Sequence, residues 1–412
     1  MQHIDGEVIV IDNHSTDGSF AFFKGRFPEI QFIWNETNSG FAKANNQALA
    51  FAEGEYILFL NPDTIVPEDC FQKCIAFIKA NESTERTCAL GIKMIDGAGN
   101  FLKESKRAFP SPLTSFYKLS GLAGLFSQSK KFGKYYLGYL NENENHEVDV
   151  LAGAFMMVPK HILNVIGTFD ENFFMYGEDI DLSFRIQEAR YKNWYFAESC
   201  IIHFKGESTK KGSLNYVKLF YRAMSIFVKK HYRSNRARVF SLFIHGAIFM
   251  RASFSALHRL LKWIPLPVKS TSTSATKYDN NNQTLILGNS GEFKQVIDLL
   301  GQAGRNETII GRIETGNITD VNTIGFFSEL EKILKSKPVK KIIFCEGQLS
   351  FKEIIETIPV IPKHISIQLF SSGSHAIIGS DDKDAAGNFI FKNSQSHSEP
   401  HHLSSDEKLF ER

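Results

Sequence analysis

The sequence has few cysteines and no long uninterrupted apolar run. Its 412 residues include only 5 cysteines, scattered and without a C-x-x-C pair, which argues against a disulfide framework and for a reducing compartment. The first residues, MQHIDGEVIVIDNHSTDG, lack the basic segment and apolar core of a signal peptide. The net charge of +2 gives no sign of a nucleic-acid partner. We therefore expect a cytoplasmic protein that does not bind nucleic acid.

Residues 216–268 are basic and aromatic at first and then more apolar, but Arg251, His258 and Arg259 interrupt the apolar part. The uninterrupted stretch is shorter than the roughly 20 apolar residues that a spanning helix needs. Two interpretations stay open. The segment could be an amphipathic element in the membrane interface, giving peripheral contact with the inner face of the cytoplasmic membrane. It could equally be a pair of helices packed on the preceding domain.

Residues 1–215 alternate between strand and helix patterns. The apolar runs EVIVI, QFIW and EYILFL are each followed by a polar turn or a helical pattern. This alternation predicts an α/β fold with a mostly parallel sheet, whose ligands bind beyond the carboxyl ends of the strands. The turns DNHSTDGS and NPDT fall at those ends. We interpret the less regular residues 100–147 as a long excursion on the same side as the active site.

The first two polar turns suggest a nucleotide site. Asp12 ends the first strand and could accept a hydrogen bond from a base or ribose hydroxyl, although Asx-turn chemistry alone explains such a residue. Gly40 allows a close approach before a helix whose amides would face a ligand above the sheet. The polar residues of these two turns are Asp12, Asn13, Ser15 and Asp17 in the first, and Asn38 and Asn45 around the second.

Two strand ends offer ligands for a divalent cation. Asp63 follows the strand YILFL, with only Asn61 and Pro62 between, and can hold a hard cation that neutralises a diphosphate. His203 ends another apolar strand, where a histidine is more often a core or edge residue. A carboxylate with an imidazole suits Mn²⁺ or Mg²⁺.

The stretch FFMYGEDIDLSFRI, residues 173–186, combines three carboxylates with apolar neighbours. Glu178 or Asp179 can cap a helix over 180–190, which is the structural interpretation of this cluster. Burial behind the flanking apolar residues would instead raise the pKa of a carboxyl group toward that of a useful general base. We favour Asp179 as the base, with Glu178 as its neighbour and Asp181 in a structural role.

Six segments in this order resemble the family 2 glycosyltransferases, and among them the rhamnosyltransferase-like bacterial enzymes of surface-polysaccharide assembly. The segments are EVIVIDNHSTDGS, NETNSGFAKANNQA, ILFLNPDT, LAGAFMMVPK, FDENFFMYGEDIDLSFRI and HFKGEST, which span about residues 7–215. The resemblance implies a GT-A fold, a UDP- or dTDP-linked sugar as donor, a divalent cation and inversion at the anomeric carbon. It also implies a saccharide acceptor, which we expect to be lipid-linked.

The resemblance assigns roles by position. Asp12 and its turn would hold the nucleotide, Asn61 and Asp63 the metal and diphosphate, and His203 would complete the metal site. Gly153 and Ala154 would line the acceptor side. Two departures stand out: Asn61 occupies a place that is usually a carboxylate, and the family's first strand, which ends in Tyr-Asn, and most of the helix after it are missing, so the chain resembles an N-terminally truncated member.

The rest of the chain predicts further parts. A polar linker spans 269–283, a small α/β domain spans 284–380, and a disordered tail spans 381–412. In the small domain, Gly288 and Gly291 lie between a strand and a helix as in a nucleotide-binding turn, but the full G-x-G-x-x-G spacing is absent. This domain loosely resembles nucleotide-binding-like domains attached to some sugar-phosphate transferases.

Three functions remain in competition. The motif set favours an inverting glycosyltransferase acting at the membrane. The missing first strand leaves room for a non-catalytic nucleotide-sugar-binding or scaffold protein. A nucleotidyltransferase would share the metal and the α/β layer, but the first strand end lacks a basic, Gly-rich phosphate loop.

Overall fold

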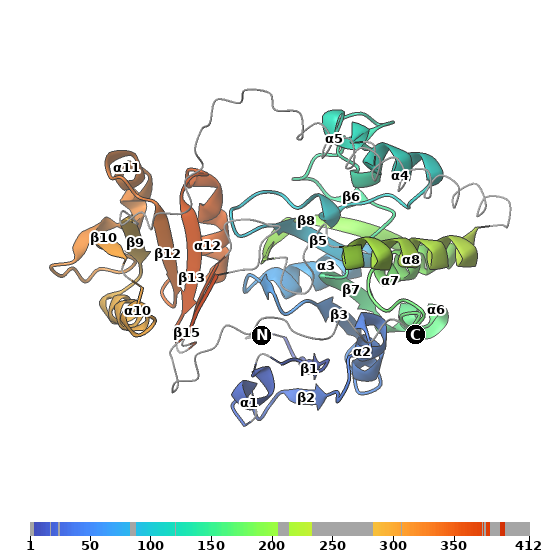
Figure 1. Cartoon of the computed structure of the whole chain (residues 1–412), viewed down its shortest axis with the longest axis horizontal. Coiled ribbons are helices and arrows are strands. Elements are labelled where there is room, and N and C mark those ends of the chain that lie inside the picture. Colours follow the sequence, from blue (N-terminus) through green and yellow to red (C-terminus); the bar gives the residue numbers. More distant parts are fainter. Residues whose placement is uncertain are drawn as a thin grey trace, which may run out of the picture. The chain divides into compact units, whose positions relative to one another are not determined.

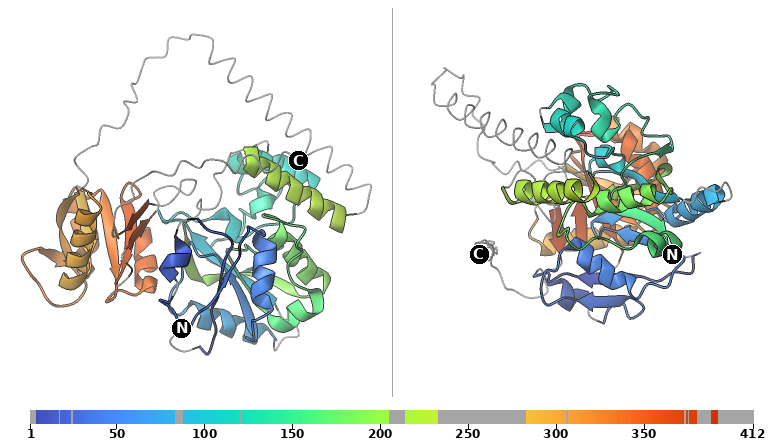
Figure 2. Two further views of the ribbon diagram at one scale, coloured as in Figure 1. Left: turned by 60° about the horizontal axis from the view of Figure 1, so that its bottom comes forward. Right: turned by 90° about the vertical axis from the view of Figure 1, so that its right-hand side faces the viewer.

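The computed structural model describes residues 4–16, 18–23, 25–82, 88–119, 121–204, 214–232, 283–305, 307–372, 374, 376–379 and 388–391. They form two compact units (Figures 1 and 2). The first unit contains the described residues up to 232 and also residues 349–363. The second contains the other described residues from 283 onward.

The first unit contains two sheets. Strands β1 (Ile9–Asp12) and β2 (Gln31–Trp34) pair in parallel, and helix α1 (Ser19–Phe23) connects them. The larger sheet has the order β3-β7-β5-β8-β4, with β6 paired to β8. Its strands are β3 (Tyr56–Leu60), β4 (Thr64–Ile65), β5 (Cys88–Ile95), β6 (His146–Glu147), β7 (Phe155–Pro159) and β8 (Lys192–His203).

The larger sheet is mixed, whereas the sequence predicts a mostly parallel one. Strands β5 and β8 are parallel, but β7 is antiparallel to both β3 and β5, and β4 is antiparallel to β8. The α/β class is therefore confirmed and the strand directions are corrected. Alternating strand and helix patterns give the order of the elements along the chain, but they do not determine which strands become neighbours.

Helices cover both faces of this sheet. On one face lies α3 (Cys70–Glu82), whose Cys70, Cys74 and Ile78 recur every four residues and are buried against strands β5 and β7. The other face is covered by α2 (Phe41–Leu49), α6 (Lys160–Ile166) and α7 (Glu178–Glu188). All residues of β7 are buried, as expected for a strand between two helical layers.

The excursion after β5 forms a group of short helices. These are η1 (Lys103–Ser105), α4 (Pro112–Leu119), α5 (Leu122–Leu125) and η2 (Gly133–Tyr136). Helices α4, α5 and η2 pack against one another, and the chain then returns to the sheet at β6 (Figure 1).

Helix α8 (Leu214–His231) packs on the first unit. Its Ala223, Met224, Phe227 and Val228 are buried in a cluster that also contains Ile180 of α7. The packed-helix interpretation therefore holds for the described part of 216–268, and residues 233–268 lie outside the described residues. Among the described helices, none is both long and apolar enough to cross a membrane.

The second unit is a seven-stranded sheet of order β11-β10-β9-β12-β13-β14-β15. The first five strands in this order are parallel, and β14 pairs in antiparallel fashion with both β13 and β15. Its elements are β9 (Gln283–Leu287), α10 (Ser290–Gln302), β10 (Thr308–Glu314), β11 (Thr323–Phe326), η3 (Phe327–Glu329), α11 (Leu330–Ser336), β12 (Lys341–Glu346), β13 (Ser366–Ser371), β14 (Ala376–Gly379) and β15 (Asn388–Phe391). Helices α12 (Phe351–Thr357) and η4 (Ile358–Val360) belong to the first unit.

Strand β15 corrects one expectation. It lies inside residues 381–412, for which the sequence predicts a disordered tail, yet Asn388–Phe391 pair with β14. The segment NFIF is too short and irregular to predict a strand by itself, and it pairs with the edge of β14. Residues 269–282 of the expected linker lie outside the described residues.

Candidate active site

The turn after β1 is joined to the turn before α2 through Asn13. Its Oδ1 accepts hydrogen bonds from the Ser39 amide at 3.0 Å and from Asn35 Nδ2 at 3.2 Å. Its Nδ2 donates to Asn38 Oδ1 at 2.8 Å and to the Gly40 carbonyl. The two predicted nucleotide-site turns therefore lie together, held by Asn13.

Asp12 and Asn45 make local hydrogen bonds. Oδ1 of Asp12 accepts from the Ser15 amide at 2.8 Å, which is an Asx-type turn. Nδ2 of Asn45 donates to the Phe41 carbonyl one helical turn earlier. Local structure explains these contacts, so a role of Asp12, Ser15 or Asn45 in nucleotide binding stays a prediction. Asp17 lies outside the described residues.

Gly40 touches the segment that precedes the acidic cluster. It has φ of 85° and ψ of 165°, a conformation open almost only to glycine, and a Cβ there would lie 2.6 Å from the Phe174 carbonyl oxygen. The next amide, of Phe41, donates to that same oxygen at 2.8 Å. The helix α2 entrance and the FFMYG segment are thus in direct contact.

Asp63 and His203 face each other across two paired strands. Thr64 is opposite His203 in the antiparallel β4–β8 pair, and this register places Asp63 Oδ1 3.2 Å from His203 Nε2. The two atoms are not aligned for a hydrogen bond. Both Asp63 Oδ1 and His203 Nδ1 are buried and have no hydrogen-bond partner among the described residues.

This pair fits a divalent cation. An unsatisfied buried carboxylate oxygen beside an imidazole nitrogen is the donor set that Mn²⁺ accepts, with Mg²⁺ preferring oxygen. The described residues contain no group of three or more ligating carboxylate, imidazole or thiol side chains. A cation there would therefore need further ligands from elsewhere, such as diphosphate oxygens and water.

The loop 151–154 links the turn that contains Asp63 to the acidic cluster of residues 178–181. The Asn61 amide donates to the Ala154 carbonyl at 3.0 Å, and the Gly153 amide lies 3.4 Å from Asp179 Oδ2. A Cβ at Gly153 would lie 3.5 Å from the Asp179 Cβ and 3.9 Å from the Phe41 ring. Two adjacent residues thus connect the Asp63 turn, α2 and the first turn of α7.

Asp179 is paired with a residue that the sequence did not single out. Arg107 Nη2 donates to Asp179 Oδ2 at 2.5 Å and to the Leu151 carbonyl at 3.0 Å. Both side chains are mostly buried, at 13% and 14% exposed. Burial alone would lower the pKa of Arg107, but the negative charge of Asp179 has the larger effect, so the pKa of Arg107 is raised above its usual value. The segment 100–147 therefore reaches the acidic cluster through the contact of Arg107 with Asp179.

The raised pKa predicted for the acidic cluster belongs to Glu178. Burial, followed by the charge of Asp179, raises the pKa of Glu178 to about 8. Its Oε2 is buried and has no hydrogen-bond partner among the described residues. With a pKa raised to about 8, Glu178 is expected to be neutral at pH 7, whereas Asp179 forms the ion pair.

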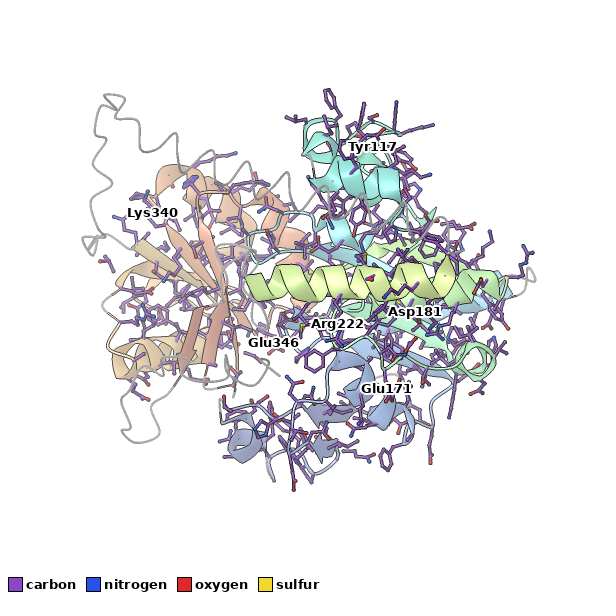
Figure 3. All side chains as sticks on the ribbon, turned by 45° about the vertical axis from the view of Figure 1, so that its right-hand side comes forward. Tyr117, Glu171, Asp181, Arg222, Lys340 and Glu346 are labelled. Atoms are coloured by element: carbon purple, nitrogen blue, oxygen red, sulfur yellow. The ribbon has the colours of Figure 1, made fainter. Side chains whose placement is uncertain are left out.

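Asp181 has the structural role expected of it. Its carboxylate, fully buried, accepts from His231 Nε2 at 2.7 Å and from Arg185 Nε at 2.9 Å, and Lys230 Nζ lies 2.9 Å away. Burial raises its pKa, but the hydrogen bonds from His231 and Lys230 prevail and lower the pKa to about 2. Asp181, on α7, thus stabilises the packing of α8 against α7 through His231 and Lys230 (Figure 3).

Part of this chain resembles known proteins. The sequence pattern of Glycosyl transferase family 2 matches residues 2–162. Residues 2–162 thus belong to glycosyltransferase family 2. Its relatives include bacterial rhamnosyltransferases, so the chain is rhamnosyltransferase-like.

Two relatives and one solved structure illustrate the match. N-acetylglucosaminyl-diphospho-decaprenol L-rhamnosyltransferase of Mycobacterium tuberculosis is 25% identical over 232 residues, which are 54% of this chain and 74% of that enzyme. Rhamnosyltransferase WbbL of Escherichia coli is 30% identical over 172 residues, or 40% of this chain and 61% of that enzyme. The crystal structure of GalNAc-T7 with UDP, GalNAc and Mn²⁺ matches with a TM-score of 0.37 and 16% identity, covering 54% of this chain and 42% of that one.

The second unit lies outside residues 2–162, which match the family. In this unit, side chains of the protein itself occupy the turn that contains Gly288 and Gly291. The amides of Gly291 and Glu292 both donate to Asn289 Oδ1, and Glu292 in turn accepts from the Asn289 amide. A Cβ at Gly288 would lie 2.6 Å from Glu292 Oε2. The Glu292 carboxylate occupies the turn, and the backbone amides of the turn are bound by the capping side chains of Asn289 and Glu292. In this conformation those amides are not available to a phosphate.

Proposed function

We propose that the first unit transfers a sugar, with inversion, from a UDP- or dTDP-linked donor to a hydroxyl of a lipid-linked saccharide acceptor. The observation that carries the proposal is the loop 151–154. Its Ala154 carbonyl binds the Asn61 amide, and its Gly153 amide lies beside Asp179. A diphosphate at Asp63 and a hydroxyl at Asp179 would consequently be neighbours, as a direct displacement at the anomeric carbon requires.

Asp63 and His203 would hold a divalent cation, Mn²⁺ or Mg²⁺, which supplies positive charge against the departing diphosphate. Asp179 is the general base. Its carboxylate takes the proton of the acceptor hydroxyl while that oxygen bonds to the anomeric carbon and the bond from this carbon to the diphosphate oxygen breaks. Arg107, fixed by the Leu151 carbonyl, holds Asp179 Oδ2 in place.

Names of relatives guide the choice of acceptor. The mycobacterial relative is named for N-acetylglucosaminyl-diphospho-decaprenol, a sugar linked through diphosphate to a lipid. For this chain we infer an acceptor of the same class, used in cell-surface polysaccharide synthesis at the inner face of the cytoplasmic membrane. The relative's substrate makes this class the first to test.

The test is release of nucleoside diphosphate from UDP- and dTDP-sugars, with and without Mn²⁺ and a polyprenyl-diphosphate sugar. Asp179→Asn should lower turnover by about 10²- to 10⁴-fold, the usual contribution of a general base, at unchanged donor affinity by calorimetry. The control is Glu188→Gln, an exposed carboxylate at the end of the same helix. It should keep full turnover.

The outcomes separate the competing functions. Full turnover in Asp179→Asn would remove this residue from the role of base, and a loss confined to Glu178→Gln would move the role to its neighbour. Donor binding without turnover in the unaltered chain would instead favour a nucleotide-sugar-binding or scaffold protein.

A further inference from the structure

The helical excursion of the first unit carries charge of one sign. No Asp or Glu occurs between Glu104 and Glu142, a stretch of 37 residues. The same stretch holds six basic residues, namely Lys106, Arg107, Lys118, Lys130, Lys131 and Lys134. In a chain whose acidic and basic residues are almost equal in number, 45 against 47, this separation is local and attracts anionic surfaces.

The same excursion exposes large apolar side chains. We call residues 112–136, the part formed by α4, α5 and η2, the helical lobe. Leu125 is 79% exposed, Phe126 52% and Leu113 53%. Leu125 and Phe126 are consecutive, and the exposed Lys130, Lys131 and Lys134 follow them within ten residues. Single exposed apolar residues are common, but an exposed apolar pair beside an acid-free basic run is the pattern of a membrane-surface element.

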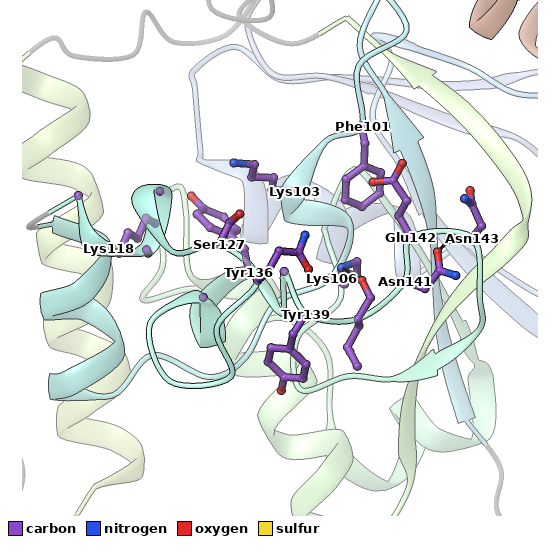
Figure 4. A pocket seen from close by; sticks show the side chains of 17 residues that line it. Phe101, Lys103, Lys106, Lys118, Ser127, Tyr136, Tyr139, Asn141, Glu142 and Asn143 are labelled. Atoms are coloured by element: carbon purple, nitrogen blue, oxygen red, sulfur yellow. Dashed lines mark hydrogen bonds between the residues drawn. The ribbon is translucent and has the colours of Figure 1, made fainter.

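A pocket opens at the base of this lobe (Figure 4). Its volume is about 840 Å³, and Lys103, Lys106 and Lys118 line it together with Tyr136, Tyr139 and one acidic side chain, Glu142. Lys106 Nζ donates to the carbonyls of Leu137 and Leu140, each at 2.8 Å. Lys106 is thus used by the protein itself, and the other two lysines and the tyrosine hydroxyls are the groups that suit a phosphate.

We propose that the helical lobe docks this glycosyltransferase on a bilayer that contains anionic phospholipid. Leu113, Leu125 and Phe126 enter the interface, and the lysines after them contact lipid phosphates, with one headgroup in the pocket. The lobe belongs to the same excursion that brings Arg107 to Asp179. Docking here would therefore hold the proposed base close to a membrane-bound acceptor. The inference goes beyond the proposed transfer and does not depend on it, because binding to a membrane needs no donor.

The test is flotation of the full chain with vesicles of phosphatidylcholine alone or with phosphatidylglycerol. Each lysine near an anionic surface contributes about 1 kcal/mol, which is on the order of fivefold in partitioning. Lys130→Ala with Lys131→Ala and Lys134→Ala should therefore weaken binding to the anionic vesicles roughly a hundredfold. Leu125→Ser with Phe126→Ser should also weaken it by roughly a hundredfold, because burial of each apolar side chain is worth about 1.5 kcal/mol or more, which is on the order of tenfold.

Matched controls keep the test specific. Lys332, Lys337 and Lys340 are exposed lysines of the second unit, and Val165, 66% exposed on α6, is an apolar one of the first unit. Changing these to Ala and Ser should leave flotation unchanged. Equal flotation of the lysine triple variant and the unaltered chain would overturn the proposal. So would loss of flotation only on Arg236→Ala with Arg238→Ala, which would move docking to residues 233–268. Folding of each variant is checked by circular dichroism.

Discussion

The ion pair between Arg107 and Asp179 should be energetically coupled far more strongly than a surface pair of the same length. A double-mutant cycle of Arg107→Ala, Asp179→Asn and the double variant measures this coupling. The side chains are only 13% and 14% exposed, so an effective dielectric constant of about 20 is appropriate, and two charges about 4 Å apart then attract by about 4 kcal/mol. Main-chain amides of Gly153 and Ile180 also hold the carboxylate, so we expect about 3 kcal/mol.

The same chain supplies the control. Lys192 and Glu147 also approach to 2.5 Å, but their side chains are 28% and 45% exposed. Solvent screening and side-chain entropy should reduce their coupling to below about 1 kcal/mol. Comparing the two cycles separates burial from distance, because the N–O distance is 2.5 Å in both pairs.

Urea unfolding followed by tryptophan fluorescence is the assay. All 3 tryptophans, Trp34, Trp194 and Trp263, precede residue 283, so the signal does not come from the second unit. This matters because a two-unit chain need not unfold in one step. A coupling at Arg107–Asp179 no larger than that at Lys192–Glu147 would refute the assignment of Arg107 as the residue that holds Asp179.

Two further predictions concern stability. Glu178→Gln should remove a pH dependence: a carboxyl whose pKa is raised in the folded state makes the fold less stable as pH rises from about 4.5 to about 8, by at most about 1.4 kcal/mol per pH unit. Urea unfolding at both ends of this window checks it, and an unchanged slope in the variant would contradict it. Gly40→Ala should cost about 2 kcal/mol or more, because its Cβ would meet the Phe174 carbonyl. Gly121→Ala, with a similar φ of 83° but open space, should cost less by the same measurement.

The sequence pointed to Asp63 and His203 because His203 ends an apolar strand and Asp63 follows one. Asp63 and His203 were chosen from polar residues after apolar runs, and the β4–β8 register brings them to 3.2 Å. Strand ends are where short sequence patterns carry spatial information, since neighbouring strands of a sheet end at common edges. The contact of Gly40 with Phe174 had no such signal, because it joins residues more than 130 positions apart.

Arg107 could not be predicted in the same way. It lies in a segment without helix or strand periodicity, and its long side chain reaches Asp179 from 72 positions away. The sequence signal that Arg107 does carry is its position in a stretch without Asp or Glu, so that an acidic partner must come from elsewhere in the chain. The raised pKa was likewise expected for the cluster. It belongs to Glu178 because that carboxyl is buried, and its burial depends on contacts far apart in the sequence.

The division of charge between Glu178 and Asp179 has a consequence for activity above neutral pH. The two carboxyls are consecutive in the first turn of α7, and Arg107 pairs with only one of them. Below a pH of about 8 the buried Glu178 is neutral, and the site holds one carboxylate beside the loop that binds Asn61. Above it a second carboxylate would repel an incoming diphosphate donor.

Donor affinity should consequently fall as pH rises through about 8, and Glu178→Gln should extend the affinity to higher pH. Calorimetric titration of a nucleoside diphosphate with Mn²⁺ at several pH values measures this, with Glu188→Gln as control. Loss of affinity over the same pH range in both variants and in the unaltered chain would contradict this prediction, since the titrating group would then not be Glu178. An extended range in Glu178→Gln alone would place the second charge beside the proposed base and leave Asp179 as the carboxylate that works at neutral pH.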